Sequence, residues 1–215
     1  SEIKALLPIS NKVEGNITYL ANFVKNGPQE HIPETAFQGI MRLPAGHYHY
    51  GKISDLLSDG INPVKWWDFE INLDFEPITN QKLDELSEKF LEIFYSAVEL
   101  RLRSDVKVGF ALSGGLDSSM IVAAAREILG HNSYNLETYS HTYSEEKYAA
   151  YDESQHINKV KSFLKVDGKF ISPRKQDIVD DIEAACYHND TPAENTLISG
   201  WNTYRLAASS GAKVT

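Results

Sequence analysis

The stretch VGFALSGGLDSSMIVAAARE (residues 108–127) decides the fold, because it runs from an apolar, strand-like segment directly into a helix-like one. Between the two segments lies a turn built almost entirely of Ser, Gly and Asp. Strands that alternate with helices predict right-handed crossovers and a parallel sheet. Ligands of such sheets bind beyond the carboxyl ends of the strands, which is where we expect this turn to lie.

Outward from this turn, the alternation of strands and helices continues. The expected elements are strands 107–112, 136–143 and 169–172, a strand that begins at Lys213, and helices 118–129, 153–164, 176–187 and 197–209. The chain from about residue 76 onward is therefore predicted to be an α/β domain with a parallel sheet.

An amphipathic helix is predicted over 81–103, just before the first of these strands, with Asn80 as its N-cap. Its apolar residues recur at helical spacing with Glu and Lys between them, so they are expected to face the core. They are Leu83, Leu86, Phe90, Ile93, Phe94, Ala97 and Val98.

The first 75 or so residues differ in composition, being rich in aromatic residues, Gly and Pro. Residues 39–53 predict two short strands around the turn 44–46, and the segment 64–80 ends in a plausible linker. Trp66 and Trp67 read most simply as core aromatics of the last strand of this part. The alternative, an interdomain or subunit surface, leaves room for a homodimer.

The composition excludes several classes of protein. The 215 residues are 42% apolar and 24% charged, with a net charge of −9, as in a globular protein. We find no cluster of Lys and Arg, which argues against nucleic acid as a partner. The apolar runs are far shorter than the roughly 20 residues of a membrane span. The single cysteine, Cys186, predicts a reduced, buried thiol in a cytoplasmic protein.

The turn SGGLDSS (113–119) has the features of a phosphate-binding loop. A helix N-terminus attracts anions because its first N–H groups are unsatisfied and carry about half a positive charge. Gly114 and Gly115 remove side chains, so that an anion can reach the backbone amides. Ser113, Ser118 and Ser119 add hydroxyl donors. No Lys follows, which separates the turn from the Walker motif.

Asp117 needs an explanation of its own, since a carboxylate beside phosphate is repulsive. A bound Mg²⁺ resolves the conflict, because this ion takes hard oxygen ligands and phosphates together. A simple helix cap by Asp117 or Ser118 is the alternative, but a cap does not account for two glycines and three serines. We therefore expect a nucleotide phosphate loop with Asp117 as a metal ligand.

With its flanking residues, this loop resembles the pyrophosphate loop of the ATP pyrophosphatases, and RLRSDVKVGFALSGGLDSSMI (101–121) resembles the asparagine synthetases. Further stretches agree with that family in order and spacing: SEIKALL (1–7), FQGIMRLPAGHYHY (37–50), YDES (151–154), YHNDTP (187–192) and GAKV (211–214). The similarity covers nearly the whole chain.

The resemblance implies ATP-dependent amidation of aspartate to asparagine through β-aspartyl-AMP, with Mg²⁺ and with ammonia derived from glutamine. It also implies that residues 1–75 are the β-rich tail of an N-terminal-nucleophile glutaminase domain, and that 76–215 begin the ATP-binding synthetase domain. The implied nucleotide site comprises Leu112, Ser113, Gly114, Gly115, Leu116, Asp117, Ser118 and Ser119, with His141 where the family usually has Val or Ile beside the adenine.

Other parts of the family's catalytic machinery have no counterpart here. The glutaminase cysteine and the second phosphate loop are not found, so the catalytic residues stay unassigned and the chain is expected to be a fragment. Asp152 and Glu153 stand where a helix begins, which favours a structural role over acid–base catalysis. Two alternatives remain open: a related adenylating synthetase, of the β-lactam synthetase or peptide cyclase type, and a non-catalytic ATP-binding fragment.

Overall fold

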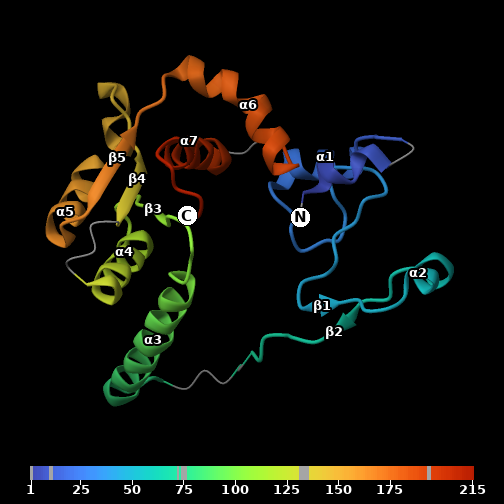
Figure 1. The fold of residues 1–215 in the computed structure, drawn as a ribbon, viewed down its shortest axis with the longest axis horizontal. Coiled ribbons are helices and arrows are strands. Elements are labelled where there is room, and N and C mark those ends of the chain that lie inside the picture. Colours follow the sequence, from blue (N-terminus) through green and yellow to red (C-terminus); the bar gives the residue numbers. More distant parts are fainter. Residues whose placement is uncertain (1, 10–11, 72, 74–76, 131–135, 193–194) are drawn as a thin grey trace. The chain divides into compact units, whose positions relative to one another are not determined.

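The computed structural model describes the chain except residues 1, 10–11, 72, 74–76, 131–135 and 193–194. It divides into two compact units, which we treat separately (Figure 1). The sheet unit comprises residues 77–182 and 195–215, and the N-terminal unit comprises 1–76 and 183–194. Residues 74–76, where the sequence suggested a change of domain, lie outside the described residues.

The sheet unit is built on three parallel strands in the order β3–β4–β5, which confirms the predicted α/β class (Figure 1). The strands are β3 (Gly109–Ala111), β4 (Glu137–His141) and β5 (Asp167–Ile171). Beyond β3, Val108 forms a parallel bridge with Val214, supported by a hydrogen bond from Gly109 N to Val214 O of 2.7 Å. The strand predicted at Lys213 is thus present as a single bridge next to β3.

Helices cover both faces of this sheet because alternate residues of each strand point in opposite directions. Phe110 and Leu112 join the main apolar core, to which α4 contributes Val122 and α5 contributes Ile157. On the opposite face, Tyr139 packs with Ala207 and Ala212. The helices of this unit are α3 (Asn80–Arg101), α4 (Leu116–Leu129), α5 (Ser154–Leu164) and α7 (Asn195–Ser209), with the start of α6 (Lys175–Asn189) and the 3-10 helix η3 (Glu146–Tyr151).

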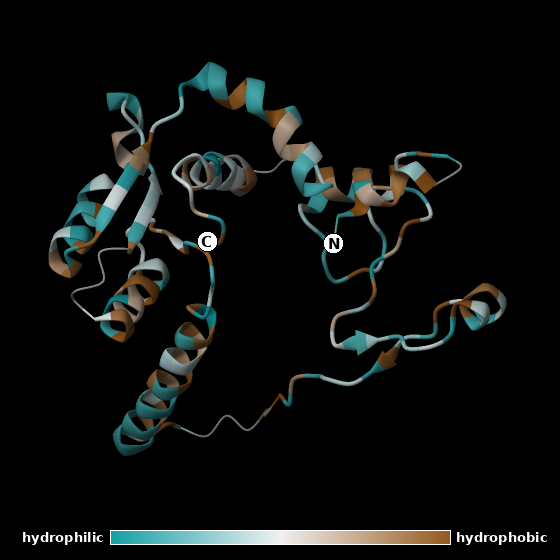
Figure 2. Ribbon diagram, viewed as in Figure 1, coloured by the Kyte–Doolittle hydropathy of each residue, from teal (hydrophilic) through white to brown (hydrophobic). Residues whose placement is uncertain are grey.

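Helix α3 departs from the prediction in two ways. Its N-cap is Thr79, whose Oγ1 accepts a hydrogen bond from Lys82 N at 3.3 Å, and Asn80 is the first helical residue. The apolar residues of its first half are exposed: Leu83 54%, Leu86 42%, Phe90 55% and Ile93 59%. Figure 2 shows hydrophobic, brown bands that alternate with hydrophilic, teal ones along α3. Only the end of α3, around Val98, packs into the core, because helical spacing fixes the apolar face but not how far a partner extends along it.

The N-terminal unit contains more helix than the sequence analysis predicted. It holds α1 (Ile17–Asn26), α2 (Ile53–Asp59), two short 3-10 helices (Ile3–Ala5 and Leu7–Ile9) and the end of α6. Its antiparallel strands are β1 (His47–Tyr48) and β2 (Val64–Lys65). The segment before the predicted turn contributes only a bridge between Met41 and Glu34.

Three side chains of the N-terminal unit differ from expectation. Trp66 and Trp67 are 68% and 48% exposed, so their reading as core aromatics is wrong. They follow β2, which among the described residues pairs only with the two residues of β1, and this leaves too little surface to bury both rings. Cys186 is half-buried rather than buried. Among the described residues, no helix has the length and apolar character that crossing a membrane requires.

Candidate functional site

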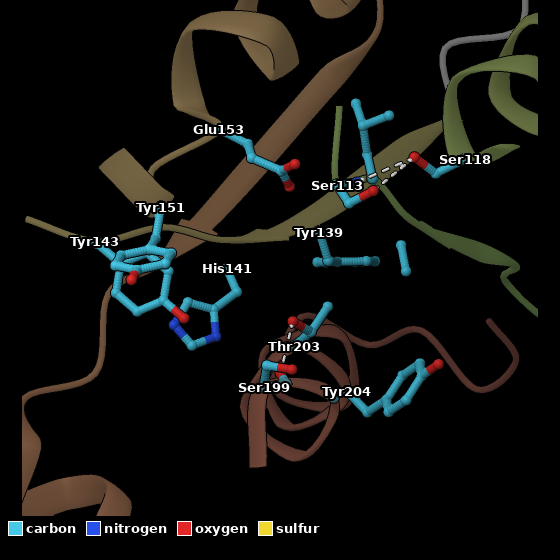
Figure 3. Close-up of a pocket in the computed structure, with 13 residues that line it drawn as sticks. Ser113, Ser118, Tyr139, His141, Tyr143, Tyr151, Glu153, Ser199, Thr203 and Tyr204 are labelled. Carbon is cyan, nitrogen blue, oxygen red and sulfur yellow. Dashed lines mark hydrogen bonds between the residues drawn. The ribbon is translucent and has the colours of Figure 1, made fainter. Parts of the chain in front are cut away.

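A pocket of about 450 Å³ lies at the carboxyl ends of β3 and β4, on the sheet face that α7 covers (Figure 3). Its position is the one expected for ligands of a parallel sheet. The lining residues come from β3, β4, the following loops and α7: Ala111, Leu112, Ser113, Ser118, Tyr139, His141, Tyr143, Tyr151, Glu153, Ser199, Gly200, Thr203 and Tyr204.

Gly114 gives the loop its close fit to the neighbouring helix. Its φ of +82° lies in the region that favours glycine, and a Cβ at this position would lie 3.0 Å from His156 Cβ and 3.1 Å from Ile157 N. Backbone conformation and packing against the first turns of α5 therefore both require glycine here.

Gly115 is the N-cap of α4 and provides no side-chain cap for the first N–H groups of the helix. The helix therefore begins with amides that no capping side chain satisfies, beside the pocket residues Ser113 and Ser118. This arrangement combines backbone donors with the positive end of the α4 dipole, which suits an anionic ligand.

The three loop serines make different hydrogen bonds. Ser113 Oγ and Ser118 Oγ lie 3.0 Å apart, and both residues line the pocket (Figure 3). Ser119 Oγ instead donates to Gly115 O at 2.7 Å, within the first turn of α4. Ser118 Oγ also lies 3.4 Å from Gly115 O, but Ser113 and Ser118 line the pocket, whereas Ser119 does not.

Leu116 and Asp117 occupy the first turn of α4 and are exposed. Leu116 is 75% exposed, Asp117 is also exposed, and neither lines the pocket. Among the described residues, no group of three or more His, Cys, Asp and Glu side chains could hold a metal ion. A metal bound by Asp117 would therefore take most of its ligands from phosphates and water, as Mg²⁺ commonly does.

Leu112 contributes to the site mainly through its backbone. Its side chain is 1% exposed and packs into the main core. Its N–H donates to Tyr139 O at 2.9 Å, and its carbonyl accepts from Ser140 Oγ at 2.7 Å. These two bonds fix the ends of β3 and β4 relative to each other, and with them the start of the loop.

His141 ends β4 at the opposite side of the pocket from the loop (Figure 3). Both ring nitrogens are buried, with no hydrogen bond of normal geometry to the described residues, and the ring lies 4.9 Å from that of Tyr143. Burial lowers the pKa of His141 below its usual value, although the nearby backbone of Ser199 opposes the shift. The site therefore favours the neutral imidazole.

Several lining residues had no signal in the sequence. Tyr139, Tyr143 and Tyr151 provide aromatic surfaces, and α7 adds Ser199, Thr203 and Tyr204. Strand alternation could have placed Tyr139 on the face of His141, but nothing in the sequence indicated that α7 returns to this edge. Asp152 accepts hydrogen bonds from Tyr143 N and from Ser154 Oγ, so it joins the end of β4 to the start of α5. This is the structural role favoured above, and the bonds also lower the pKa of Asp152.

Comparison with known proteins places this site in a family. The family model described as asparagine synthase matches residues 89–215. A Methanocaldococcus jannaschii protein named "Putative asparagine synthetase (glutamine-hydrolyzing) 2" is 27% identical over 96% of this chain and 38% of its own length. Asparagine synthetase (glutamine-hydrolyzing) 3 of Bacillus subtilis is 33% identical over 89% of this chain and 31% of its own length.

The chain thus spans about a third of the length of these curated relatives. A solved structure of an NH₃-dependent NAD synthetase from Campylobacter jejuni aligns with 60% of this chain and 53% of its own, at 17% identity and a TM-score of 0.36. The family match covers the sheet, the glycine loop and the pocket together. On this basis the chain belongs to the asparagine synthase family.

Proposed function

We propose that this chain binds ATP in the pocket at the carboxyl ends of β3 and β4. The phosphates would lie at the start of α4, against the backbone amides and the Ser113 and Ser118 hydroxyls. The adenine would lie toward His141, whose ring nitrogens are buried, and toward the neighbouring rings of Tyr143 and Tyr151. The observation that carries this proposal is the uncapped N-terminus of α4 beside the pocket.

The site offers Mg²⁺ one protein ligand, the carboxylate of Asp117. Asp117 offers one exposed carboxylate in the first turn of α4, which is one of the few ligands that Mg²⁺ takes from proteins when phosphates supply the others. When bound with ATP, the ion would neutralise charge that develops on the pyrophosphate. The residues of the chain would orient the phosphates through backbone N–H groups and hydroxyls.

For the full-length protein we propose ATP-dependent amide formation, with aspartate as the acid. A side-chain carboxylate oxygen of aspartate attacks the α-phosphorus, and the bond to pyrophosphate breaks. Ammonia then attacks the acyl carbon, AMP leaves, and a proton is released to give the amide of asparagine. The backbone N–H groups at the start of α4 would stabilise the pyrophosphate as it departs. The names of the two relatives, both asparagine synthetases, support the choice of aspartate.

Glutamine is proposed as the source of ammonia, because both relatives are named glutamine-hydrolyzing. In this proposal residues 1–75 form the end of a glutaminase domain and residues 76–215 the start of the synthetase domain. Asp117 would be the metal ligand, and the nucleotide site would comprise residues 112–119 with His141.

ATP–pyrophosphate exchange by the full-length protein, with Mg²⁺ and a panel of carboxylic acids, tests this function. We expect exchange that requires aspartate and is lost in Asp117→Ala, while Glu146→Ala, an exposed acid outside the pocket, keeps it. Exchange that requires a different acid would keep the adenylation and replace the substrate, as in a β-lactam synthetase or peptide cyclase. ATP binding without exchange for any acid would indicate a non-catalytic nucleotide-binding chain.

A further inference from the structure

Glu153 is the one carboxylate among the described residues that line the pocket, and no Lys or Arg is found among them. It is the N-cap of α5, yet its side chain makes no capping hydrogen bond. The residue is exposed, and its carboxylate therefore lies open toward the pocket. A favourable position at the helix start accounts for an acid here, but neither a capping hydrogen bond nor an ion pair with another lining residue holds the carboxylate, which stays free to bind a ligand.

The backbone that carries Glu153 is held firmly beside the phosphate loop. Ile157 N donates to Glu153 O at 3.0 Å, and the first turns of α5 pack directly against Gly114. The preceding residue, Asp152, accepts a hydrogen bond from Tyr143 N at 3.1 Å. Glu153 is thus fixed between α5, which contacts the loop, and Asp152, which is bonded to the backbone of Tyr143.

The side chain lies between the two ends of the pocket. In Figure 3 its carboxylate lies between the Ser113–Ser118 pair at one end and the rings of Tyr143 and Tyr151 at the other. A nucleotide with its phosphates at the first end and its base at the second has its ribose in this interval. Contact with phosphate itself is disfavoured, because two negative charges would repel each other without a cation between them.

We propose that Glu153 accepts hydrogen bonds from the ribose hydroxyls and so makes the site selective for ribonucleotides over 2′-deoxyribonucleotides. This inference rests on the proposed binding of ATP. An ionised carboxylate is purely an acceptor with two oxygens, and the 2′ and 3′ hydroxyls of ribose are adjacent donors. Hydrogen bonds to a charged partner are the stronger kind, so loss of one hydroxyl is expected to be readily measurable.

The test compares the affinities of ATP, 2′-deoxy-ATP and 3′-deoxy-ATP, each with Mg²⁺, by calorimetric titration of the 215-residue chain. The wild type is expected to bind ATP roughly tenfold more tightly than 2′-deoxy-ATP. Glu153→Ala should weaken ATP binding to about the affinity that the wild type has for 2′-deoxy-ATP. The affinity for 2′-deoxy-ATP itself should change little. Glu153→Gln, which keeps one acceptor oxygen, should show an intermediate preference. Glu146→Ala, outside the pocket, should keep the wild-type preference.

Equal affinities of the wild type for ATP and 2′-deoxy-ATP would overturn the ribose role while leaving nucleotide binding intact. The same conclusion follows if Glu153→Ala keeps the preference, or if it changes the requirement for Mg²⁺ instead. No binding of any of the three nucleotides by the folded wild type would overturn the nucleotide site itself. Far-UV circular dichroism and the urea midpoint identify folded variants, and Glu153→Gln serves if Glu153→Ala does not fold.

Discussion

The ring of Tyr139 on β4 lies directly against the backbone of Gly109 on β3, so that a Cβ at Gly109 would lie 2.5 Å from Tyr139 Cε2. The same Cβ would lie 3.2 Å from that of Ala212. Glycine in this strand therefore makes room for a ring that is fully buried and also lines the pocket. Packing of the sheet and the shape of the site depend on the same pair.

Gly109→Ala should destabilise the chain by about 1–3 kcal/mol, because the new methyl group overpacks the Tyr139 ring. Urea unfolding measures this loss. The double variant Gly109→Ala with Tyr139→Leu should lose less than the sum of the two single changes, since the smaller side chain leaves room for the methyl group. Strict additivity would show that Tyr139 does not dictate glycine at this position.

Gly114→Ala should destabilise the chain more than Gly130→Ala, in which the replacement strains the backbone alone. Gly130, which follows α4, is a matched control with a φ of +76° but no atom of the described residues within 4 Å of the added Cβ. Both variants carry backbone strain, while only Gly114→Ala also meets His156 and Ile157. We expect a larger drop in the urea midpoint and weaker ATP binding for Gly114→Ala alone. Equal drops in the urea midpoint of both variants would show that the positive φ alone, and not contact with α5, requires glycine at position 114.

The stability of the fold should decrease as the pH falls through the range in which Glu137, at the amino end of β4, takes up a proton. Burial by itself would raise the pKa of Glu137, but hydrogen bonds from Lys107, Tyr139 and Lys169 outweigh it and lower the pKa from 4.5 to about 2. The folded state thus prefers the ionised form, so the stabilisation is complete above pH 4.5 and is lost as pH falls toward 2. Its size is about 3 kcal/mol at most.

Glu137→Gln should therefore be less stable than the wild type near neutral pH and should lose less stability between pH 5 and pH 3. Urea unfolding across this range measures both effects. Glu146→Gln, an exposed acid in η3, should follow the wild-type profile. Parallel profiles of the wild type and Glu137→Gln would contradict the assignment.

His141 predicts a separate pH effect near neutrality. Its pKa is lowered in the folded state mainly by burial, so the unfolded chain takes up a proton first as pH falls below about 6.5. The contribution of His141 to stability is complete above that pH and declines below it. NMR titration of the His141 ring should give a pKa lower than that of an exposed histidine, and His141→Val should remove the corresponding slope in stability. A pKa at or above 6.5 would contradict this environment.

The order of elements and the glycine loop could be predicted from the sequence because both depend on local pattern. Apolar periodicity located the helices of the sheet unit, and the Gly114–Gly115 pair located the turn between β3 and α4. Other features depend on contacts distant in sequence. The Tyr139 ring can line the pocket only because Gly109 lies against it on the neighbouring strand. The residues that α7 contributes line the pocket only because this helix returns to the carboxyl ends of β3 and β4.

The misses have physical reasons too. Thr79 and Asn80 are both good capping residues, and only the backbone conformation decides between them. Helix α1 had local signals, since Asn16 accepts a hydrogen bond from Tyr19 N and Gly27 ends the helix with a φ of +79°. The exposure of Leu83 and Phe90 could not be foreseen, because an amphipathic pattern does not say what covers it.

The most direct test of the account asks whether phosphates bind at the start of α4. Amide NMR spectra of the isotope-labelled chain would be recorded during titration with pyrophosphate and with ATP, both with Mg²⁺. We predict saturable shifts of the Gly114, Gly115 and Ser118 amides with either ligand, and shifts around His141 with ATP alone. Shifts confined to residues outside the loop, or none at saturating ATP, would contradict nucleotide binding at this site.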